Sequence, residues 1–304
     1  MKRLLCFLLC LFIFRVISCQ SEITTKDHRA PVLPGYDFSS PQKIYVLPAI
    51  LHEISGITAV SSSTLACIQD ENGVVFFYNI TTDKIVKQIY FSYDGDYEGI
   101  TSVNSTLYVL RSDGVVFELR DFESEKFRKS IYVNGVPGGD NEGLCYDHLN
   151  KRLLLGPKSS FGKKGGEKDK RYVYGFDPGT KKLLPEPILI IDPVEIKKFA
   201  RENNLKVPVK NKKGDKKEPD IEFRISAMGI HPLTNKLYII SGMEQLLFVF
   251  DTKGRIEFIE WLDPEIFPHP EGITFLKNGD LFISNEGQNK SATLVRLRYN
   301  PSDF

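Results

Sequence analysis

Three glutamates stand directly before a glycine in a short phrase that recurs along the chain. They are Glu98, Glu142 and Glu271, and two further copies of the phrase carry Ser55 and Met228 at this position. If the copies come from equivalent strands around one channel, three carboxylates converge there. Burial and like-charge repulsion then oppose their all staying ionised and unpaired. Protonation, a basic partner or a bound cation would each relieve the strain.

The residues around these glutamates add further acidic groups. Three positions before each glycine stand Glu53, Asp96, Asp140, Ser226 and His269, and the ends of the second strands add Asp70, Lys158 and Glu286. Carboxylates with backbone carbonyls and water suit a hard cation, and Ca²⁺ tolerates irregular oxygen geometry better than Mg²⁺. Zn²⁺ suits the set less well, because only His269 offers nitrogen. We predict a Ca²⁺ site.

The predicted metal ligands are Glu98, Glu142 and Glu271. Lys158 and Arg111 are the candidate basic partners if no ion binds. The alternative is structural, with each glutamate bonding backbone amides of the next repeat and each glycine serving close packing or a positive φ.

The spacing of the phrase predicts the fold. Its glycines (Gly56, Gly99, Gly143, Gly229 and Gly272) are separated by 43, 44, 86 and 43 residues. A period of 40 to 45 residues with strand-like content is typical of a β-propeller. Each period holds a series of short apolar runs, with hairpin turns at Asn72-Gly73 and Asp113-Gly114. We predict an all-β fold, a five-bladed β-propeller of four-stranded antiparallel blades.

The last repeat lacks a fourth strand, and a spare strand at 42–47 precedes the first repeat. Pairing the two closes the ring and removes an exposed edge. The double step of 86 residues contains two insertions in the third blade, at about 159–171 and 192–222, with the fourth strand of that blade expected at 187–191. The second insertion begins with Asp192 as N-cap and Pro193 at the first helical position, which predicts a helix to about Asn204. A lysine-rich loop is expected after it, over 206–220.

The N-terminus reads as an export signal. Lys2 and Arg3 precede an apolar run that is too short to span a bilayer, and the run 16–19 (Val-Ile-Ser-Cys) resembles a bacterial lipobox. We predict a lipoprotein signal peptide at 1–18, lipidation of Cys19, a linker at 19–40 and a single propeller domain at 41–300. The expected location is the bacterial cell envelope, in the outer membrane or periplasm. Ordinary cleavage, or a free cysteine, is the alternative.

The net charge and the absence of known catalytic motifs argue against several classes of protein. Loss of Lys2, Arg3 and Arg15 with the signal would move the net charge from +1 to −2, which gives no nucleic-acid footprint. The sequence has no Gly-x-Ser-x-Gly elbow, Walker loop or His-Glu-x-x-His motif. Cys67 and Cys145 fall in non-adjacent repeats, so we expect buried free thiols. We expect a monomer.

The repeat phrases, with Asn285-Glu286-Gly287 after the last, resemble the SdiA-regulated family of exported bacterial β-propellers, which is distantly similar to NHL-repeat proteins. The resemblance spans roughly 40–300 and implies five blades and a calcium site. Met228 departs from the pattern. We therefore expect a calcium-binding, envelope-anchored propeller that acts as a recognition or scaffold module for an unknown protein or small molecule. The alternative is a Ca²⁺-dependent hydrolase of lactones or phosphoesters, similar to gluconolactonase and phytase propellers, with His269 or Asp70 as base.

Overall fold

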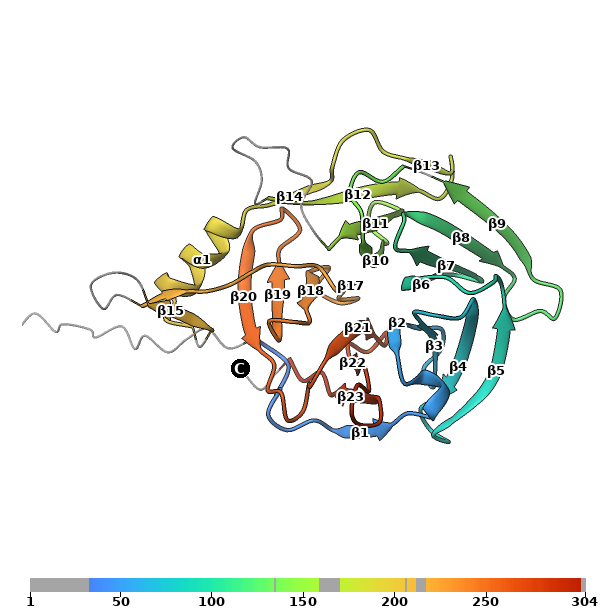
Figure 1. Cartoon of the computed structure of the whole chain (residues 1–304), viewed down its shortest axis with the longest axis horizontal. Coiled ribbons are helices and arrows are strands. Elements are labelled where there is room, and N and C mark those ends of the chain that lie inside the picture. Colours follow the sequence, from blue (N-terminus) through green and yellow to red (C-terminus); the bar gives the residue numbers. More distant parts are fainter. Residues whose placement is uncertain (1–32, 134, 159–169, 206, 212–216, 302–304) are drawn as a thin grey trace, which may run out of the picture.

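Five small antiparallel sheets are arranged around a central axis in a computed structural model of the chain (Figure 1). The structure describes residues 33–133, 135–158, 170–205, 207–211 and 217–301. The predicted five-bladed propeller is confirmed. Its innermost strands contact one another in a closed ring around the axis, in the order β2, β6, β10, β17, β21.

The strands follow the sequence repeat from the axis outward. Blade one consists of β2 (Ile54–Ala59), β3 (Thr64–Gln69), β4 (Val74–Asn79) and β5 (Lys84–Tyr90). Blade two consists of β6 (Tyr97–Val103), β7 (Thr106–Arg111), β8 (Val115–Arg120) and β9 (Arg128–Val133). Blade three consists of β10 (Asn141–Asp147), β11 (Arg152–Pro157), β12 (Arg171–Asp177), β13 (Lys182–Leu183) and β14 (Leu189–Ile191). Blade four consists of β17 (Ala227–Ile230), β18 (Leu237–Ser241), β19 (Leu246–Phe250) and β20 (Ile256–Trp261). Blade five consists of β21 (Pro270–Phe275), β22 (Leu281–Asn285), β23 (Thr293–Leu297) and β1 (Lys43–Val46).

The first strand of the chain closes the ring, as predicted. β1 pairs antiparallel with β23, from Lys43 opposite Arg296 to Val46 opposite Thr293. The last blade thus receives its outer strand from the other end of the sequence. A short 3-10 helix (Ala49–Leu51) leads from β1 to blade one.

Blade three departs from the expected pattern. In place of a single fourth strand at 187–191, two short strands, β13 and β14, both pair with β12 and share that position. In the second insertion, helix α1 (Pro193–Glu202) begins as predicted, with the Asp192 side chain accepting a hydrogen bond from the Val194 amide. It ends at Glu202, two residues before the expected boundary.

The lysine-rich segment is not wholly a loop. Its described residues include a two-stranded ribbon, in which β15 (Val209–Asn211) pairs with β16 (Lys217–Pro219). The helix and ribbon lie beside blade four, where Ile196 and Ala200 pack into its core (Figure 1). The insertion therefore covers part of the outer strand β20.

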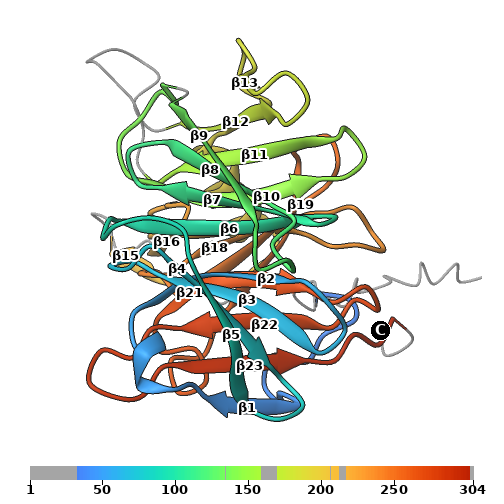
Figure 2. The ribbon, with the colours of Figure 1, turned by 90° about the vertical axis from the view of Figure 1, so that its right-hand side faces the viewer.

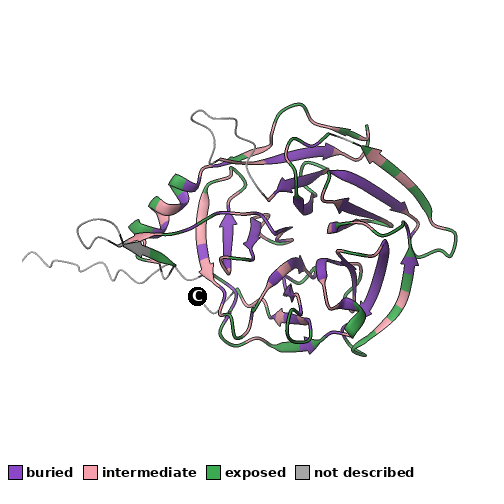
Figure 3. Ribbon diagram, viewed as in Figure 1, coloured by how far each residue is buried: buried purple, intermediate pink, exposed green. Residues whose placement is uncertain are grey.

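Burial decreases from the axis outward. The inner three strands of a blade are mostly buried, whereas β5 and β9 consist mainly of exposed and half-buried residues (Figure 3). Seen from the side, β5 and β9 cross steeply over the inner strands, which shows the twist within each blade (Figure 2). The core lies between neighbouring sheets, and Cys67 and Cys145 are buried free thiols within it, as predicted.

The folded domain begins before the first strand. Leu33, Tyr36 and Phe38 are buried against blades four and five, so part of the expected 19–40 linker packs onto the propeller. The predicted signal peptide, Cys19 and the insertion over 159–169 lie outside the described residues. No helix within the described ranges is long and apolar enough to cross a membrane.

Candidate cation site in the axial channel

A β-bulge interrupts the innermost strand of three blades at the glutamate of the repeat phrase. In β6, Tyr97 pairs with Arg111 and Gly99 pairs with Leu110, so Glu98 has no partner in the ladder. Glu142 in β10 and Glu271 in β21 are the extra residues in the same way. A bulge re-aims the side chain at the extra position. β17, which carries Met228 instead of glutamate, has a regular register.

The glycine after each bulge allows neighbouring blades to approach closely. A Cβ on Gly99 would lie 2.6 Å from Leu144 Cβ and 3.0 Å from the Glu142 carbonyl oxygen. A Cβ on Gly56 would lie 3.0 Å from the Glu98 carbonyl oxygen. The distance of 2.6 Å is too short for a real side chain, and each contact of 3.0 Å would require the neighbouring backbone to move. Close packing, and not a positive φ, therefore explains these two glycines.

The bulged glutamates meet in one cavity at the end of the channel, the acidic chamber. It has a volume of about 190 Å³ and is lined by Glu53, Ile54, Ser55, Asp70, Glu98, Glu142, Lys158, His269, Glu271 and Glu286. The predicted convergence of Glu98, Glu142 and Glu271 is thus present. Six carboxylates face one lysine and one histidine in this lining, so positive charge is in deficit.

Glu142 is the most buried of the three glutamates, with 4% of its side chain exposed. Its Oε1 pairs with the Lys158 ammonium, while Oε2 is buried and has no hydrogen-bond partner among the residues that the structure describes. Of the two predicted basic partners, Lys158 is therefore the one that pairs with a glutamate of the repeat phrase. The other, Arg111, instead pairs with Asp113 at 2.8 Å.

The carboxylates fall into two groups. Oxygens of Glu98, Asp140 and Glu142 lie within 4.8 Å of one another, and so do ligand atoms of His269, Glu271 and Glu286. The structure therefore separates Glu271 from the other two predicted ligands and supplies Asp140 in its place. Asp140 comes from the second acidic tier of the sequence. The sequence repeat identifies these acidic positions, but it does not show which of them lie close together in the structure.

Burial dominates the electrostatics of the chamber. It raises the pKa of Glu98 to about 9, with Glu142 and Asp96 adding repulsion. Burial likewise raises the pKa of Glu271 to about 8, and that of Glu142 to about 7 although Lys158 opposes the shift. The pKa of Asp70 rises to about 6 for the same reason, reinforced by Glu53. Protons therefore occupy part of this cluster at neutral pH, and a cation would displace them.

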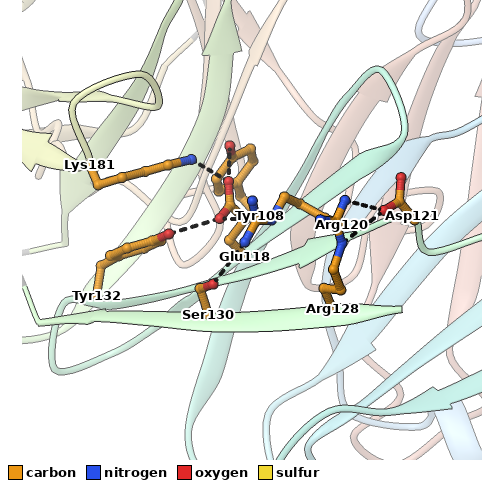
Figure 4. A network of polar contacts seen from close by, with 8 residues as sticks. All are labelled: Tyr108, Glu118, Arg120, Asp121, Arg128, Ser130, Tyr132 and Lys181. Atoms are coloured by element: carbon orange, nitrogen blue, oxygen red, sulfur yellow. Dashed lines mark hydrogen bonds and ion pairs between the residues drawn. The ribbon is translucent and has the colours of Figure 1, made fainter. Parts of the chain in front are cut away.

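A buried glutamate outside the chamber shows the opposite behaviour. Glu118, 1% exposed, accepts hydrogen bonds from the Tyr108 and Tyr132 hydroxyls at 2.8 Å each and from Lys181 of blade three (Figure 4). Burial alone would raise its pKa, but these donors outweigh it and lower the pKa. The fold thus satisfies a structural carboxylate fully here, whereas it leaves Glu142 Oε2 bare.

His269 lies at the partly exposed side of the chamber. Its Nδ1 is 2.7 Å from Glu286 Oε2 and 3.3 Å from Glu271 Oε1, yet makes no aligned hydrogen bond. Its carbonyl oxygen accepts a hydrogen bond from the Glu286 amide at 2.9 Å, which fixes the two residues side by side. Three residues that the repeat pattern singles out thus form one compact group.

The other end of the channel is chemically different. A cavity of about 150 Å³ there has no charged residue in its described lining, which includes Thr58, Thr101 and Thr274. Two of these hydroxyls accept hydrogen bonds from the next blade, Thr274 from the Ala59 amide at 3.0 Å and Thr58 from the Ser102 amide at 3.2 Å. A neck of about 10 Å³ separates the two ends. The unsatisfied charge therefore lies at the acidic end.

Comparisons with known proteins identify the fold. No family model and no curated protein matches the chain. Among solved structures, it is similar to a glutaminyl cyclase from Myxococcus xanthus, with a TM-score of 0.57 and 14% identity over 86% of this chain and 97% of that one. A luciferin-regenerating enzyme gives a TM-score of 0.48 at 11% identity, over 85% of this chain and 95% of that one. The first similarity supports the β-propeller architecture, and at this identity it extends to the fold alone.

Proposed function

We propose that the chain is a Ca²⁺-binding β-propeller of the bacterial cell envelope, of the SdiA-regulated type, whose acidic chamber holds the ion and whose surrounding face recognises a partner. The observation that carries the proposal is Glu142 Oε2. It is a buried carboxylate oxygen without a hydrogen-bond partner, in a group with Glu98 and Asp140. A buried carboxylate oxygen without a partner is costly even when the other oxygen is paired, and a cation offsets that cost.

The donor set fits calcium. Ca²⁺ takes oxygen ligands at 2.3–2.6 Å, so two ligands on opposite sides of one ion lie up to about 5 Å apart. The oxygens of Glu98, Asp140 and Glu142 lie within 4.8 Å of one another. Water from the partly exposed chamber would complete the coordination. Bound calcium would supply positive charge, and the protein residues would hold it where blades two and three meet.

Calorimetric titration of the metal-free protein tests the proposal. We expect one Ca²⁺ per chain, with Mg²⁺ binding much more weakly, and loss of binding in Glu98→Gln and Glu142→Gln. Asp83→Asn is the matched control, because Asp83 forms an exposed ion pair with Lys43 outside the chamber. Absence of calcium binding by the wild-type protein, or equal binding by all variants, would refute the site.

A Ca²⁺-dependent hydrolase of lactones or phosphoesters is the second candidate. It is favoured by the partial exposure of the chamber, since 25% of the His269 side chain and 27% of that of Glu286 are accessible. His269 and Asp70 both line the chamber and could serve as base. A panel of lactones, phosphoesters and, because of the solved cyclase, an N-terminal glutaminyl peptide tests it. Turnover that stops with chelator and with Glu142→Gln would favour the enzyme, whereas no turnover with intact Ca²⁺ binding would favour the recognition module.

The envelope location rests on the sequence. We propose that Cys19 becomes the acylated first residue, which tethers the propeller to a membrane. Labelling with a fatty-acid analogue in a bacterial host, with Cys19→Ser as control, tests this. A label on Cys19→Ser, or none on the wild-type protein, would contradict it.

A further inference from the structure

The acidic chamber contains a second group of possible ligands, chemically unlike the calcium group. His269, Glu271 and Glu286 offer one imidazole nitrogen and two carboxylate oxygens within 4.8 Å of one another. This group uses none of the residues of the calcium group, Glu98, Asp140 and Glu142. Glu98 and Glu142 line the same chamber, and their charges act on Glu271.

The geometry around His269 calls for a cation between the three side chains. Nδ1 is buried, lacks an aligned hydrogen bond, and faces Glu286 Oε2 at 2.7 Å and Glu271 Oε1 at 3.3 Å. An unprotonated ring nitrogen would direct its lone pair at two carboxylates if both were ionised. A ring proton, a carboxyl proton or a metal ion must therefore lie between these groups.

The distances suit a small metal ion. Ligands bound to Zn²⁺ at 2.0–2.1 Å in tetrahedral geometry are about 3.4 Å apart. The separation of 3.3 Å between Nδ1 and Glu271 Oε1 is close to this value. The separation of 2.7 Å between Nδ1 and Glu286 Oε2 would have to lengthen by about 0.7 Å to reach it. Mixed imidazole and carboxylate donors suit zinc and other first-row transition metals, whereas Ca²⁺ takes oxygen.

The backbone holds these ligands in place before any metal arrives. His269 immediately precedes β21 and Glu286 immediately follows β22, and the Glu286 amide donates to the His269 carbonyl oxygen at 2.9 Å. Glu271 is the bulge residue of β21. All three donors are thus fixed to two paired strands of blade five, so little ordering is required on binding.

We propose that His269, Glu271 and Glu286 form a second metal site, specific for a first-row transition ion such as Zn²⁺, beside the calcium group. Three protein ligands leave one tetrahedral position open toward the chamber, the arrangement found in catalytic and not in closed structural zinc sites. The inference lies in the same chamber as the proposed function but does not require calcium to bind.

Cobalt titration of the metal-free protein tests the inference. Co²⁺ in a tetrahedral site gives strong visible absorption, so we expect one equivalent to produce it, and Zn²⁺ to abolish it. His269→Gln should lower the Co²⁺ affinity at least about 100-fold, since even loss of an outer-shell partner costs 10–100-fold. His148→Gln is the matched control, because His148 is exposed and outside the chamber lining.

Different results would refute the two proposed metal sites. Ca²⁺ titration of His269→Gln also reports whether the variant is folded, and we expect its calcium affinity to change far less than its cobalt affinity, because the variant keeps Glu98, Asp140 and Glu142. Absence of the cobalt spectrum in the wild-type protein, or an unchanged spectrum in His269→Gln, would overturn the inference and leave His269 as an imidazolium paired with two carboxylates. Cobalt binding without calcium binding would instead refute the proposed function and leave this site standing.

Discussion

Replacement of Glu98 by glutamine should stabilise the metal-free protein while removing its response to calcium. Glu98 is half-buried near Glu142 and Asp96, and its pKa rises to about 9. A carboxyl group whose pKa is higher in the folded protein than in the unfolded chain stabilises the fold fully only below the unfolded pKa. This stabilisation is lost as the pH rises from the unfolded pKa to the folded pKa. Glutamine keeps the shape of the protonated side chain and its ability to donate, but has no charge to desolvate.

The magnitude follows from the shift. At pH 7.5 the raised pKa would lower the free energy of unfolding by up to about 4 kcal/mol, because each of the roughly three pH units above the ordinary pKa costs about 1.36 kcal/mol. Relaxation and water in the half-buried site reduce this, so we expect about 1–2 kcal/mol. For a domain of this size that corresponds to an increase in Tm of roughly 2–8 °C.

Calcium should reverse the order of stability. A ligand at 100 times its Kd stabilises the folded wild-type protein by about 2.7 kcal/mol, and Glu98→Gln should gain almost none of this. Thermal unfolding followed by circular dichroism, with EDTA or with calcium, measures both effects, and Asp83→Asn serves as control. A lower Tm for Glu98→Gln in EDTA, or an equal calcium-induced increase in both proteins, would refute the reasoning.

Three further predictions concern the same electrostatics. Calcium affinity should rise between pH 6 and 9, because protons compete with the ion at Glu142 and Glu98, whose pKa values are about 7 and 9. Calorimetry in buffers of different ionisation enthalpy should detect the release of protons. A calcium affinity that does not change with pH would contradict this. Lys158→Met should lower the stability of the metal-free protein by about 2 kcal/mol, because Glu142 loses its partner. The same variant should bind calcium at least about tenfold more tightly, because a competing positive charge is gone. A drop in calcium affinity would show instead that the lysine supports the site. Glu118→Gln should cost about 2–4 kcal/mol through its buried donors and leave calcium affinity unchanged, as thermal unfolding and calorimetry would show.

The repeat phrase determined the architecture without help from the coordinates. Its period and the hairpin signals were sufficient for five blades, because the chain completes each of the first four blades before the next begins. The spare strand at 42–47 was sufficient for ring closure, because the last repeat lacks an outer strand of its own. The same repeat identified the acidic positions, since equivalent residues of a propeller occupy equivalent places around the axis. It also indicated Lys158 as a basic partner, and the lysine pairs with Glu142.

The tertiary structure alone decided how those positions are used. A bulge at Glu98, Glu142 and Glu271 depends on the register between two strands, which the sequence does not display. The division into one group with Asp140 and another with His269 depends on distances of a few ångströms across the channel. In the first group these contacts join Glu98 to residues 42 and 44 positions further along the chain, in the next blade. Periodicity places side chains on a common axis, but only packing between blades sets which of them meet.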